Sequence, residues 1–460
     1  MVINSPLIHL PENTINSRSK RFFYDFTISD HSDFMSRLLN WANSNFETIT
    51  FLNSNQSEND PYSSYNKILA AGIKTEIIVD HQNQQPFEML KNFSDQNQDW
   101  IFGFMTYELN NKNIQQSWGY ELQKTDHIQM PLMHFYIPEI LFFVDKSSIS
   151  MGFANNGTTK TQAEDILRTI ETFRVCDTSV PLSPPRIKQR VSREDYLKNA
   201  KNIQKHILRG DIYEMNYCIE FFSHDKINPL RTYLELTQKN PSPFSCFYKK
   251  RAHFVMSSSP ERFLAKRNNK LISQPIKGTI KRGATKVKDT QLKQQLLNDP
   301  KERSENIMIV DLVRNDLSRS AEKGSVKVEE LCGIYTYPHV HQMISTISCN
   351  LHPRCHFADA IKKAFPMGSM TGAPKIRAME IIHDYEITKR GLYSGAVGYI
   401  TPGKDFDFNV VIRSILYNAV NKYVSFMAGS ALTVASDPEK EYEECLLKAS
   451  AMASVLGSQW

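Results

Sequence analysis

Runs of apolar residues along the chain predict a protein that is rich in β-strands. Strands are expected from Phe22 to Phe26, from Trp100 to Leu109 and over 134–145, where the run ends in Ile-Leu-Phe-Phe-Val. A glycine inside the second of these runs indicates a place where two backbones lie close together. Further strands are predicted at 211–222, 392–400, 407–417 and 422–428, and a strand from 254 ends in a turn that carries Glu261.

Helical spacing of apolar residues predicts helices between these strands, at 161–173, 192–210, 298–317, 358–365 and two further places. Ser192 is followed by an acid three residues later, as in a capping box, and Gly210 ends that helix. Pro374 is predicted at the first position of one further helix, and Asp437 followed by a proline predicts the start of the last.

One predicted strand, Ser273–Arg282, carries a lysine between isoleucines. Ile276 and Ile280 mark the face that packs inward, so alternation alone places Lys277 on the solvated face together with Thr279. The alternative is a lysine held near the sheet and partly removed from water. Burial would then lower the pKa of the amine and make it a usable nucleophile.

The amino-acid composition is typical of a soluble globular protein. The 460 residues are 41% hydrophobic and 23% charged, and the net charge of +6 comes from interspersed signs without a long basic run, which argues against a nucleic-acid partner. No apolar run approaches the roughly 20 residues that span a bilayer, and Met1–Pro6 shows no signal-peptide pattern. We therefore expect a cytoplasmic protein that does not bind membranes.

Seven cysteines are scattered without a Cys-x-x-Cys pair, which favours reduced thiols over a disulfide framework or a zinc site; they are Cys176, Cys218, Cys246, Cys332, Cys349, Cys355 and Cys445. A proline-rich segment, Val180-Pro-Leu-Ser-Pro-Pro185, indicates the main boundary. It divides an N-terminal β-rich region, 1–180, from a second part, 190–460.

Charged residues at helical spacing suggest a cation site. Glu441, Glu444 and Lys448 share one face of the last predicted helix, and Glu305 lies on another helix. Carboxylates of this kind hold Mg²⁺ when the two helices meet. A solvated, salt-bridged face would show the same spacing.

Two other features suit an anionic ligand. Gly368-Ser-Met-Thr-Gly-Ala-Pro-Lys375 leads from small residues into a helix N-terminus, where backbone N–H groups favour carboxylate or phosphate, although an ordinary tight turn has the same composition. Arg413 lies in the apolar run Val410-Val-Ile-Arg-Ser-Ile-Leu416. Its guanidinium suits a carboxylate of a ligand, or a structural ion pair.

Together these segments resemble the chorismate-utilising enzymes, in family order from Ser192 to about Ser454. The matching blocks begin at Gly210 (Gly-Asp-Ile-Tyr-Glu-Met-Asn), Ser259 (Ser-Pro-Glu-Arg-Phe), Pro275 (Pro-Ile-Lys-Gly-Thr), Glu302 (Glu-Arg-Ser-Glu-Asn-Ile), Gly368 (Gly-Ser-Met-Thr-Gly-Ala-Pro-Lys), Tyr393 (Tyr-Ser-Gly-Ala-Val-Gly-Tyr) and Ser436 (Ser-Asp-Pro-Glu-Lys-Glu-Tyr-Glu-Glu). The resemblance implies an α+β fold, a sandwich of antiparallel β-sheets flanked by helices. It makes 190–460 the chorismate-binding catalytic domain, and 1–180 a β-rich region that packs on this core.

Lys277 decides which branch of the family the chain resembles. Pro-Ile-Lys-Gly-Thr and Asn216 are similar to aminodeoxychorismate synthase component I, and Glu214 stands where isochorismate synthases have a lysine. The resemblance implies that Lys277 attacks C2 of chorismate and displaces the C4 hydroxyl, after which ammonia adds at C4 and expels the lysine. The product, 4-amino-4-deoxychorismate, serves p-aminobenzoate and folate synthesis.

The same resemblance implies roles for other residues, position by position. Glu261 is the acid/base, and Mg²⁺ is bound by Glu305 and Glu444, with Glu441 close behind. The implied substrate-binding residues are Ser369, Tyr393, Arg413, Lys448, the backbone at Gly429, and Gln342.

The chain departs from the family pattern at a few positions. Gln342 replaces the usual active-site histidine, and the adjacent His341 would point the other way on a strand. Gly429-Ser-Ala replaces a run richer in glycine, and Ala435 replaces an aspartate. Because this position holds Gln342, catalytic assistance by a histidine is not expected there.

The rival functions are anthranilate synthase component I, which would aminate C2 and eliminate pyruvate, and a catalytically silent binding subunit of a glutaminase complex. Retention of Lys277, Glu261 and Glu305 together argues against the silent subunit. Because no glutaminase-type Gly-x-Cys-x-Gly block is found, we expect ammonia to come from a separate glutaminase subunit or from free ammonium.

Overall fold

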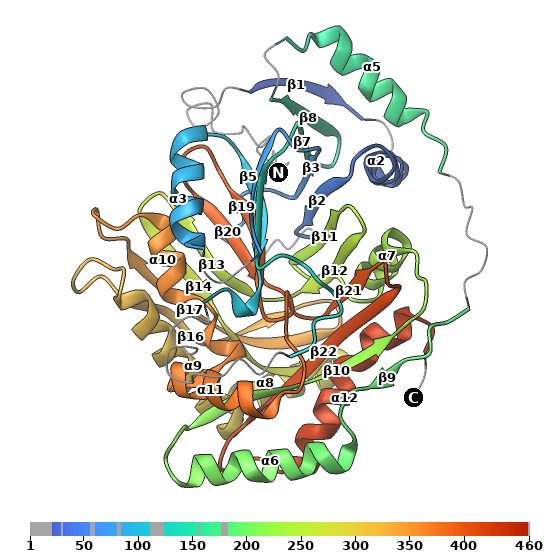
Figure 1. The fold of residues 1–460 in the computed structure, drawn as a ribbon. Coiled ribbons are helices and arrows are strands. Elements are labelled where there is room, and N and C mark those ends of the chain that lie inside the picture. Colours follow the sequence, from blue (N-terminus) through green and yellow to red (C-terminus); the bar gives the residue numbers. More distant parts are fainter. Residues whose placement is uncertain are drawn as a thin grey trace.

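Two large antiparallel β-sheets lie face to face at the centre of the molecule (Figure 1). The computed structural model describes residues 21–28, 31–55, 60–80, 84–110, 124–154, 157–175 and 183–458. Within these residues every strand pair of the two sheets is antiparallel. The predicted α+β sandwich is confirmed.

The first sheet has 12 strands among the described residues. In spatial order they are β1 (Phe22–Thr27), β8 (Ser148–Phe153), β7 (Ile140–Val144), β3 (Lys67–Ala71), β2 (Thr48–Asn53), β11 (Phe244–Lys250), β12 (His253–Ser259), β21 (Ser414–Asn418), β22 (Tyr423–Leu432), β10 (Glu214–Ser223) and β18 (Gly372–Ala373), with β9 (Lys188–Gln189) beside β10.

The second sheet has 10 strands in the same described part of the chain. Their order is β15 (Ile276–Lys281), β17 (Val340–Asn350), β14 (Lys270–Gln274), β13 (Arg262–Arg267), β20 (Phe406–Val410), β19 (Ala396–Ile400), β5 (Ile101–Met105), β6 (Met133–Ile137) and β4 (Thr75–Val79), with β16 (Lys327–Thr336) beside β17.

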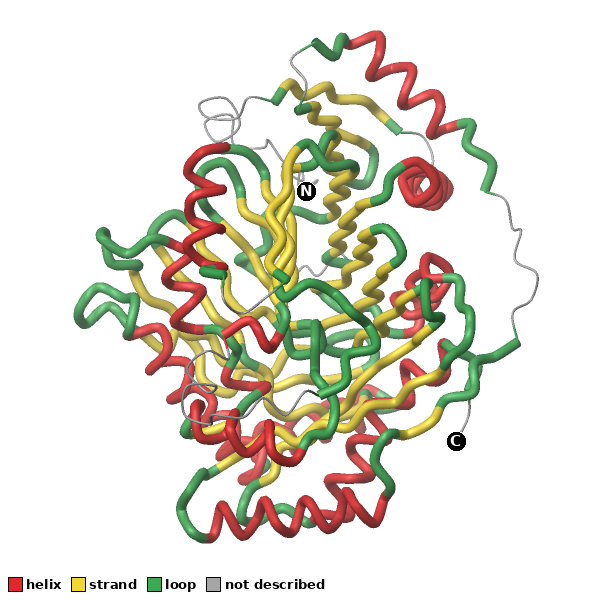
Figure 2. Tube along the Cα trace, viewed as in Figure 1, coloured by secondary structure: helices red, strands yellow, loops and turns green. Residues whose placement is uncertain are grey.

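Three buried apolar layers hold the sheets and helices together. One cluster draws aromatic residues from both sheets, including Phe102, Tyr136 and Tyr248, and fills the space between them. The other two clusters cover the outer faces, where the helices lie (Figures 1 and 2). These helices are α2 (His31–Asn45), α3 (Pro86–Asn97), α5 (Lys160–Glu171), α6 (Arg193–Leu208), α7 (Pro229–Lys239), α8 (Lys286–Asn298), α9 (Pro300–Ser318), α10 (Phe357–Ala364), α11 (Lys375–Tyr385) and α12 (Pro438–Val455).

Local signals placed several elements correctly. The Ser192 side chain caps α6 by accepting a hydrogen bond from the Asp195 amide, and Asp437 caps α12 ahead of Pro438. Gly103 in β5 lies where two backbones meet, since a Cβ there would be 2.1 Å from the carbonyl oxygen of His134. Pro374 was predicted one position too far into its helix, because α11 begins at Lys375.

Two predicted strands are wrong, because each is a pair of strands in different sheets. The run 134–145 divides into β6 and β7 at Pro138, which has no amide hydrogen to continue the ladder. The run 407–417 divides into β20 and β21 around Arg413, whose φ is +48°. At both places the chain leaves one sheet and enters the other.

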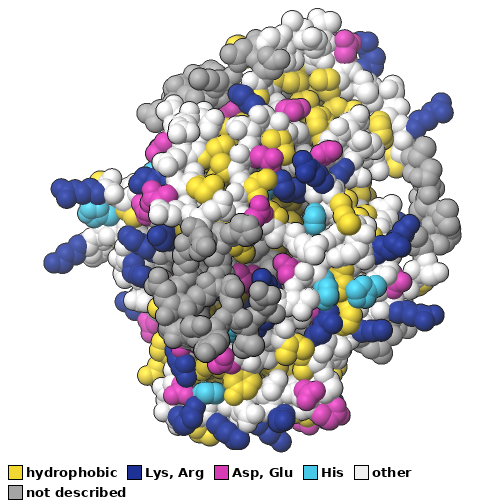
Figure 3. Space-filling view, viewed as in Figure 1, with side chains coloured by type: hydrophobic (Ala, Val, Ile, Leu, Met, Phe, Trp, Pro, Cys, Tyr) yellow, Lys and Arg dark blue, Asp and Glu magenta, His cyan; other side chains and the backbone are white. Residues whose placement is uncertain are grey.

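Segments before and after residue 180 share both sheets. β5 pairs with β19, and β2 pairs with β11. The proline-rich boundary falls partly outside the described residues, at 180–182, and so does Cys176. The division into 1–180 and 190–460 stays a prediction. None of the helices in the described ranges has the length and apolar character needed to cross a membrane. Basic and acidic side chains both lie on the face of the molecule that Figure 3 shows.

Candidate active site

Lys277 lies in an irregular part of the second sheet. Pro275 separates β14 from β15, and both strands pair with β17. The register shifts between Ile276 and Thr279, and Gly278 between them has φ +92°, which an L side chain rarely adopts. This bulge breaks the alternation that assigned Lys277 to the solvated face. The Lys277 side chain is only 12% exposed.

The Lys277 amine is held by a carboxylate of the other sheet. Its Nζ donates a hydrogen bond of 2.6 Å to Oε1 of Glu214, at the start of β10. Burial alone would lower the pKa of Lys277, but the charges of Glu214 and Glu305 outweigh burial and raise it above the ordinary value. The sequence expectation of a lowered pKa is wrong, because burial was not the only influence.

Glu261 lies where the chain passes from β12 in the first sheet to β13 in the second. Its carboxylate is buried and accepts a hydrogen bond of 2.6 Å from the Ser369 hydroxyl. Burial raises the pKa of Glu261 to about 7, although the Ser369 hydrogen bond and the Lys277 and Arg413 charges oppose it. Glu261 is therefore able to give up and take back a proton near neutral pH.

Arg413 lies at another crossing between the sheets and shares the environment of Glu261. Burial lowers the pKa of its guanidinium, and the charge of Glu261 opposes this. Within the described residues the guanidinium has no hydrogen-bond partner, whereas its carbonyl oxygen accepts from the Ser258 amide. A half-buried cation without a protein partner favours an anionic ligand over a structural ion pair.

The three glutamates predicted for Mg²⁺ lie on two facing helices, α9 and α12. Lys301 Nζ is 3.1 Å from Oε1 of Glu441 and 3.8 Å from Oε1 of Glu305, and Glu444 Oε1 is 2.5 Å from Lys448 Nζ. Burial raises the pKa of Glu305 to about 7. Its Oε1 is buried and has no hydrogen-bond partner in the part of the chain that the structure describes.

These glutamates suit a divalent cation in ligand type and charge. An ammonium already lies between two of them, and carboxylate oxygens are the ligands that Mg²⁺ prefers. No group of three or more His, Cys, Asp or Glu residues in the described ranges is close enough to hold a metal as it stands. Metal binding would therefore require these carboxylates to move closer together.

The remaining predicted residues lie in β22, in β17, in α12 and in the turn before β19. Lys448 donates to the carbonyl oxygen of Gly429 at 3.0 Å, and a Cβ at Gly429 would lie 2.5 Å from Cys218 Sγ. The hydroxyl of Tyr393 accepts a weak hydrogen bond from the same sulfur at 3.9 Å. Gly429 and Tyr393 thus meet at Cys218.

Gln342 is buried in β17 opposite Thr279, two residues from Lys277. Its Oε1 has no hydrogen-bond partner among the described residues. The ring of His341 hydrogen-bonds to Asp289 and Thr336 instead, on a different side of the strand from Gln342. The histidine next in sequence therefore does not replace the missing one.

Sequence reasoning missed a buried arginine that joins two walls of the site. Arg390 forms an ion pair with Glu386 and donates to the carbonyl oxygens of Met370 (2.6 Å) and Asn216 (2.9 Å). Met370 follows Ser369, and Asn216 is close to Glu214. A charged pair four residues apart was the available signal, but this segment lies beyond the end of α11, where helical spacing does not apply.

Comparison with known proteins gives one family. The family model described as chorismate binding enzyme matches residues 49–454. Aminodeoxychorismate synthase component 1 of Escherichia coli (strain K12) is 37% identical over 257 residues, which are 56% of this chain and 56% of that protein. The probable chloroplastic aminodeoxychorismate synthase of Oryza sativa subsp. japonica is 42% identical over 269 residues, 58% of this chain and 30% of that protein.

A solved structure is similar over most of its length. The crystal structure of anthranilate synthase component I from Streptococcus pneumoniae TIGR4 has a TM-score of 0.72 and 26% identity, and the match covers 86% of this chain and 93% of that one. The match to the curated relatives is shorter, since the chain spans 56% of the bacterial relative's length and 30% of the plant relative's.

Proposed function

The chain belongs to the family of chorismate binding enzymes, and from this premise we propose that it aminates chorismate at C4 to give 4-amino-4-deoxychorismate. The observation that carries the proposal is the position of Lys277, a buried amine beside the proton acceptor Glu214 and in the field of Glu261. A nucleophile, a base and an acid with a pKa near 7 are the groups that two successive allylic displacements require.

Because the surrounding carboxylates raise the pKa of Lys277, its ammonium passes a proton to Glu214 in the same step in which the nitrogen attacks. In this first displacement the nitrogen attacks C2 of chorismate, both ring double bonds shift, and the C4 hydroxyl leaves as water with the proton of Glu261. In the second displacement ammonia attacks C4 and the C2–N bond to Lys277 breaks. The lysine nitrogen recovers its proton from Glu214, and the new ammonium returns one to Glu261.

The other site residues position the anionic substrate. Arg413, a cation without a partner in the described protein, would pair with a carboxylate of chorismate. Ser369 fixes the Glu261 carboxylate at 2.6 Å. Tyr393, Gln342, Lys448 and the backbone at Gly429 would complete the substrate contacts.

Mg²⁺ would be held by Glu305, Glu441 and Glu444, and would neutralise a ring carboxylate. The orphaned Oε1 of Glu305 and the ammonium of Lys301 between the glutamates support this assignment. Thermal unfolding tests it without an activity measurement. Mg²⁺ should raise the midpoint of the wild type and leave that of Glu305→Gln unchanged, because only bound ligand stabilises the native state. An equal rise in both would contradict the assignment.

Ammonia would come from a separate glutaminase subunit. The name of the Escherichia coli relative, component 1, supports a partner of this kind. We also propose that the product enters p-aminobenzoate and folate synthesis.

Product analysis tests the proposed function directly. Purified protein is incubated with chorismate, Mg²⁺ and ammonium, and the products are separated and identified by mass. We expect 4-amino-4-deoxychorismate. The similarity to an anthranilate synthase structure keeps anthranilate as the competing product, and its fluorescence would contradict C4 amination. Unchanged chorismate would instead favour a silent subunit.

A further inference from the structure

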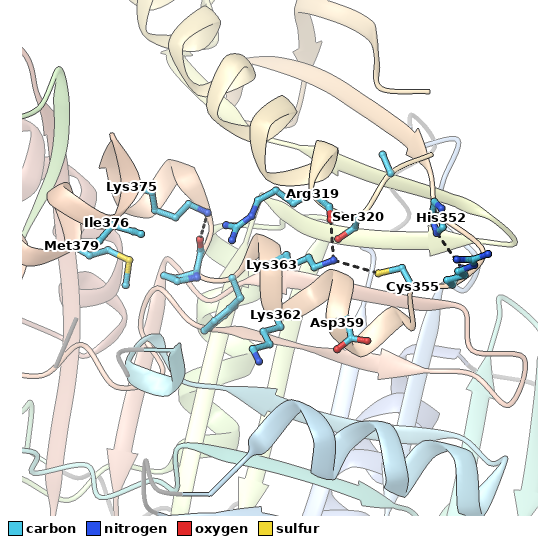
Figure 4. A pocket seen from close by; sticks show the side chains of 14 residues that line it. Arg319, Ser320, His352, Cys355, Asp359, Lys362, Lys363, Lys375, Ile376 and Met379 are labelled. Carbon is cyan, nitrogen blue, oxygen red and sulfur yellow. Dashed lines mark hydrogen bonds between the residues drawn. The ribbon is translucent and has the colours of Figure 1, made fainter. Parts of the chain in front are cut away.

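A second concentration of charge lines a cavity of about 550 Å³ that contains none of the residues assigned to the reaction (Figure 4). The cavity lies between the C-terminal end of α9, the segment leading into α10, and the first turn of α11. Five of its lining residues are cationic: Arg319, Arg354, Lys362, Lys363 and Lys375.

The one acid in the lining is Asp359, and its carboxylate lies 3.9 Å from Lys91 of α3. Arg319 makes no ion pair within the described residues, and in Figure 4 its side chain extends between Lys375 and Lys363.

The inner end of the cavity presents two buried polar groups. Lys375 is bound to Asp316 at 2.5 Å and to the carbonyl oxygens of Pro366 (2.8 Å) and Ala364 (3.0 Å). Ser320 is 3% exposed, and its hydroxyl has no hydrogen-bond partner in the described part of the chain. A buried hydroxyl without a partner is costly unless a ligand or water completes it.

The remaining walls are apolar and come from Phe365, Pro366, Ile376 and Met379. Cavities of roughly 300–1,000 Å³ with apolar walls and a few convergent polar groups are typical of small-molecule sites. A protein surface that covered this cavity would not reach the hydroxyl of Ser320, which is buried. The shape therefore favours a small ligand with an organic body over an acidic protein partner.

We propose that this cavity binds a small organic molecule that carries at least two phosphate or carboxylate charges. Arg319 and Arg354 pair with its oxyanions, and the Ser320 hydroxyl donates to the group that enters deepest. The apolar wall receives the organic part.

Occupancy of this site is coupled to the reaction centre through the segment Pro366–Lys375. Lys375 binds the backbone immediately before the short turn Gly368–Met370, and Ser369 of that turn holds Glu261. An anion beside Arg319 and Lys375 changes the electrostatic potential at the ion pair between Lys375 and Asp316. This alters how firmly the turn is held, so the ligand acts as a regulator of the acid Glu261.

Calorimetric titration at low ionic strength tests the binding, with pyrophosphate, citrate and inorganic phosphate as probes. Pyrophosphate or citrate should bind at one site and inorganic phosphate more weakly; the stronger of the first two identifies the oxyanion. Arg319→Gln should weaken binding about tenfold, through loss of a charge-assisted hydrogen bond.

The matched control is Arg314→Gln, which removes a cation of the same helix that pairs with the exposed Asp311. It should change binding less than about twofold. An equal loss in both variants would show a diffuse charge effect and overturn the proposal. Absence of saturable binding with every probe would also overturn it, and would leave an acidic protein surface as the alternative occupant.

Hydrogen exchange tests the coupling independently of catalysis. Pyrophosphate or citrate, whichever binds, should slow the exchange of amides in 366–375 in the wild type and not in Arg319→Gln. Binding without any change in these amides would refute the coupling. Because both measurements use only binding and exchange, their failure is distinct from failure of the proposed amination.

Discussion

Lys277 and Lys375 form nearly the same ion pair in two different environments. Each amine lies against one carboxylate, at 2.6 Å from Glu214 and at 2.5 Å from Asp316, and each side chain is about as buried, with 12% and 13% exposed. Their pKa values nevertheless move in opposite directions. That of Lys277 is raised above its ordinary value and that of Lys375 is lowered.

The difference lies in the charges beyond the pair. Burial lowers the pKa of both amines. The charges of Glu305 and Glu444 add to that of Glu214 and raise the pKa of Lys277. At Lys375 the charge of Asp316 raises the pKa, but the charge of Arg319 lowers it. A salt bridge therefore does not determine the character of its site. The carboxylate-rich surroundings of Lys277 attract cations, and the arginine-rich surroundings of Lys375 attract anions.

The largest effect is expected from Lys277→Ala, which removes the only proposed nucleophile. C4 amination should fall by more than about 10⁴-fold, as is typical when a covalent catalyst is deleted. Lys281→Ala, at the exposed end of the same strand, is the matched control and should keep full activity. The measurement is 4-amino-4-deoxychorismate formation with ammonium. Undiminished formation by Lys277→Ala would refute the covalent role.

Glu214→Gln tests whether the partner of Lys277 acts as a proton acceptor. Glutamine keeps a hydrogen-bond acceptor beside the amine but does not take its proton, so kcat should fall between about 10² and 10⁴-fold. The kcat of Glu214→Asp should fall less than that of Glu214→Gln. An unchanged kcat with a lowered pKa for Lys277 would mean that Glu214 only positions the amine.

The raised pKa of Glu261 predicts a dependence of stability on pH. Protonated Glu261 is favoured by the folded state, because its pKa rises from 4.5 to about 7. Its stabilising contribution is full below about pH 4.5 and is lost as pH rises through 7, by up to about 3 kcal/mol.

Denaturant unfolding of the wild type and Glu261→Gln at pH 5 and pH 8 measures this loss. The wild type should lose more stability than the variant between the two values. The rate with chorismate should also decline above pH 7 as the acid loses its proton. Parallel pH dependence of unfolding in both proteins would contradict the assigned pKa.

The smallest effect is expected at the basic cavity. Arg319→Gln removes repulsion toward Lys375 together with attraction toward Asp316, so the free energy of unfolding at low salt should change by less than about 1 kcal/mol, since Arg319 is exposed. The change should disappear in 0.5 M salt. A larger loss of stability at low salt would show that Arg319 is held by the fold and does not await a ligand.

Structure that is set by neighbouring residues was predictable from the sequence. Caps at Ser192 and Asp437, the close approach at Gly103 and the apolar strands follow from local chemistry, and the ordered motifs specified the fold through resemblance. Contacts between residues that are distant in sequence were not predictable in this way. Alternation assigned Lys277 to the wrong face, because the bulge opposite β17 depends on a strand more than 60 residues away.

The electrostatic environment of the candidate site was also not predictable from the sequence. Glu214 was recognised as a branch difference only, since its contact with Lys277 joins two different sheets. The buried Arg390, which holds the backbones of Met370 and Asn216, also depends on a meeting of distant segments.

The positions of the last four strands have a consequence for how the chain folds. β21 and β22 lie between β12 and β10 in the first sheet, and β19 and β20 lie between β5 and β13 in the second. Each sheet therefore remains in two pieces until residues 396–432 have left the ribosome. Long-range pairing of this kind gives a high contact order and slow folding. During synthesis the unpaired edges of β10, β12, β5 and β13 are the surfaces that a chaperone would need to protect from aggregation.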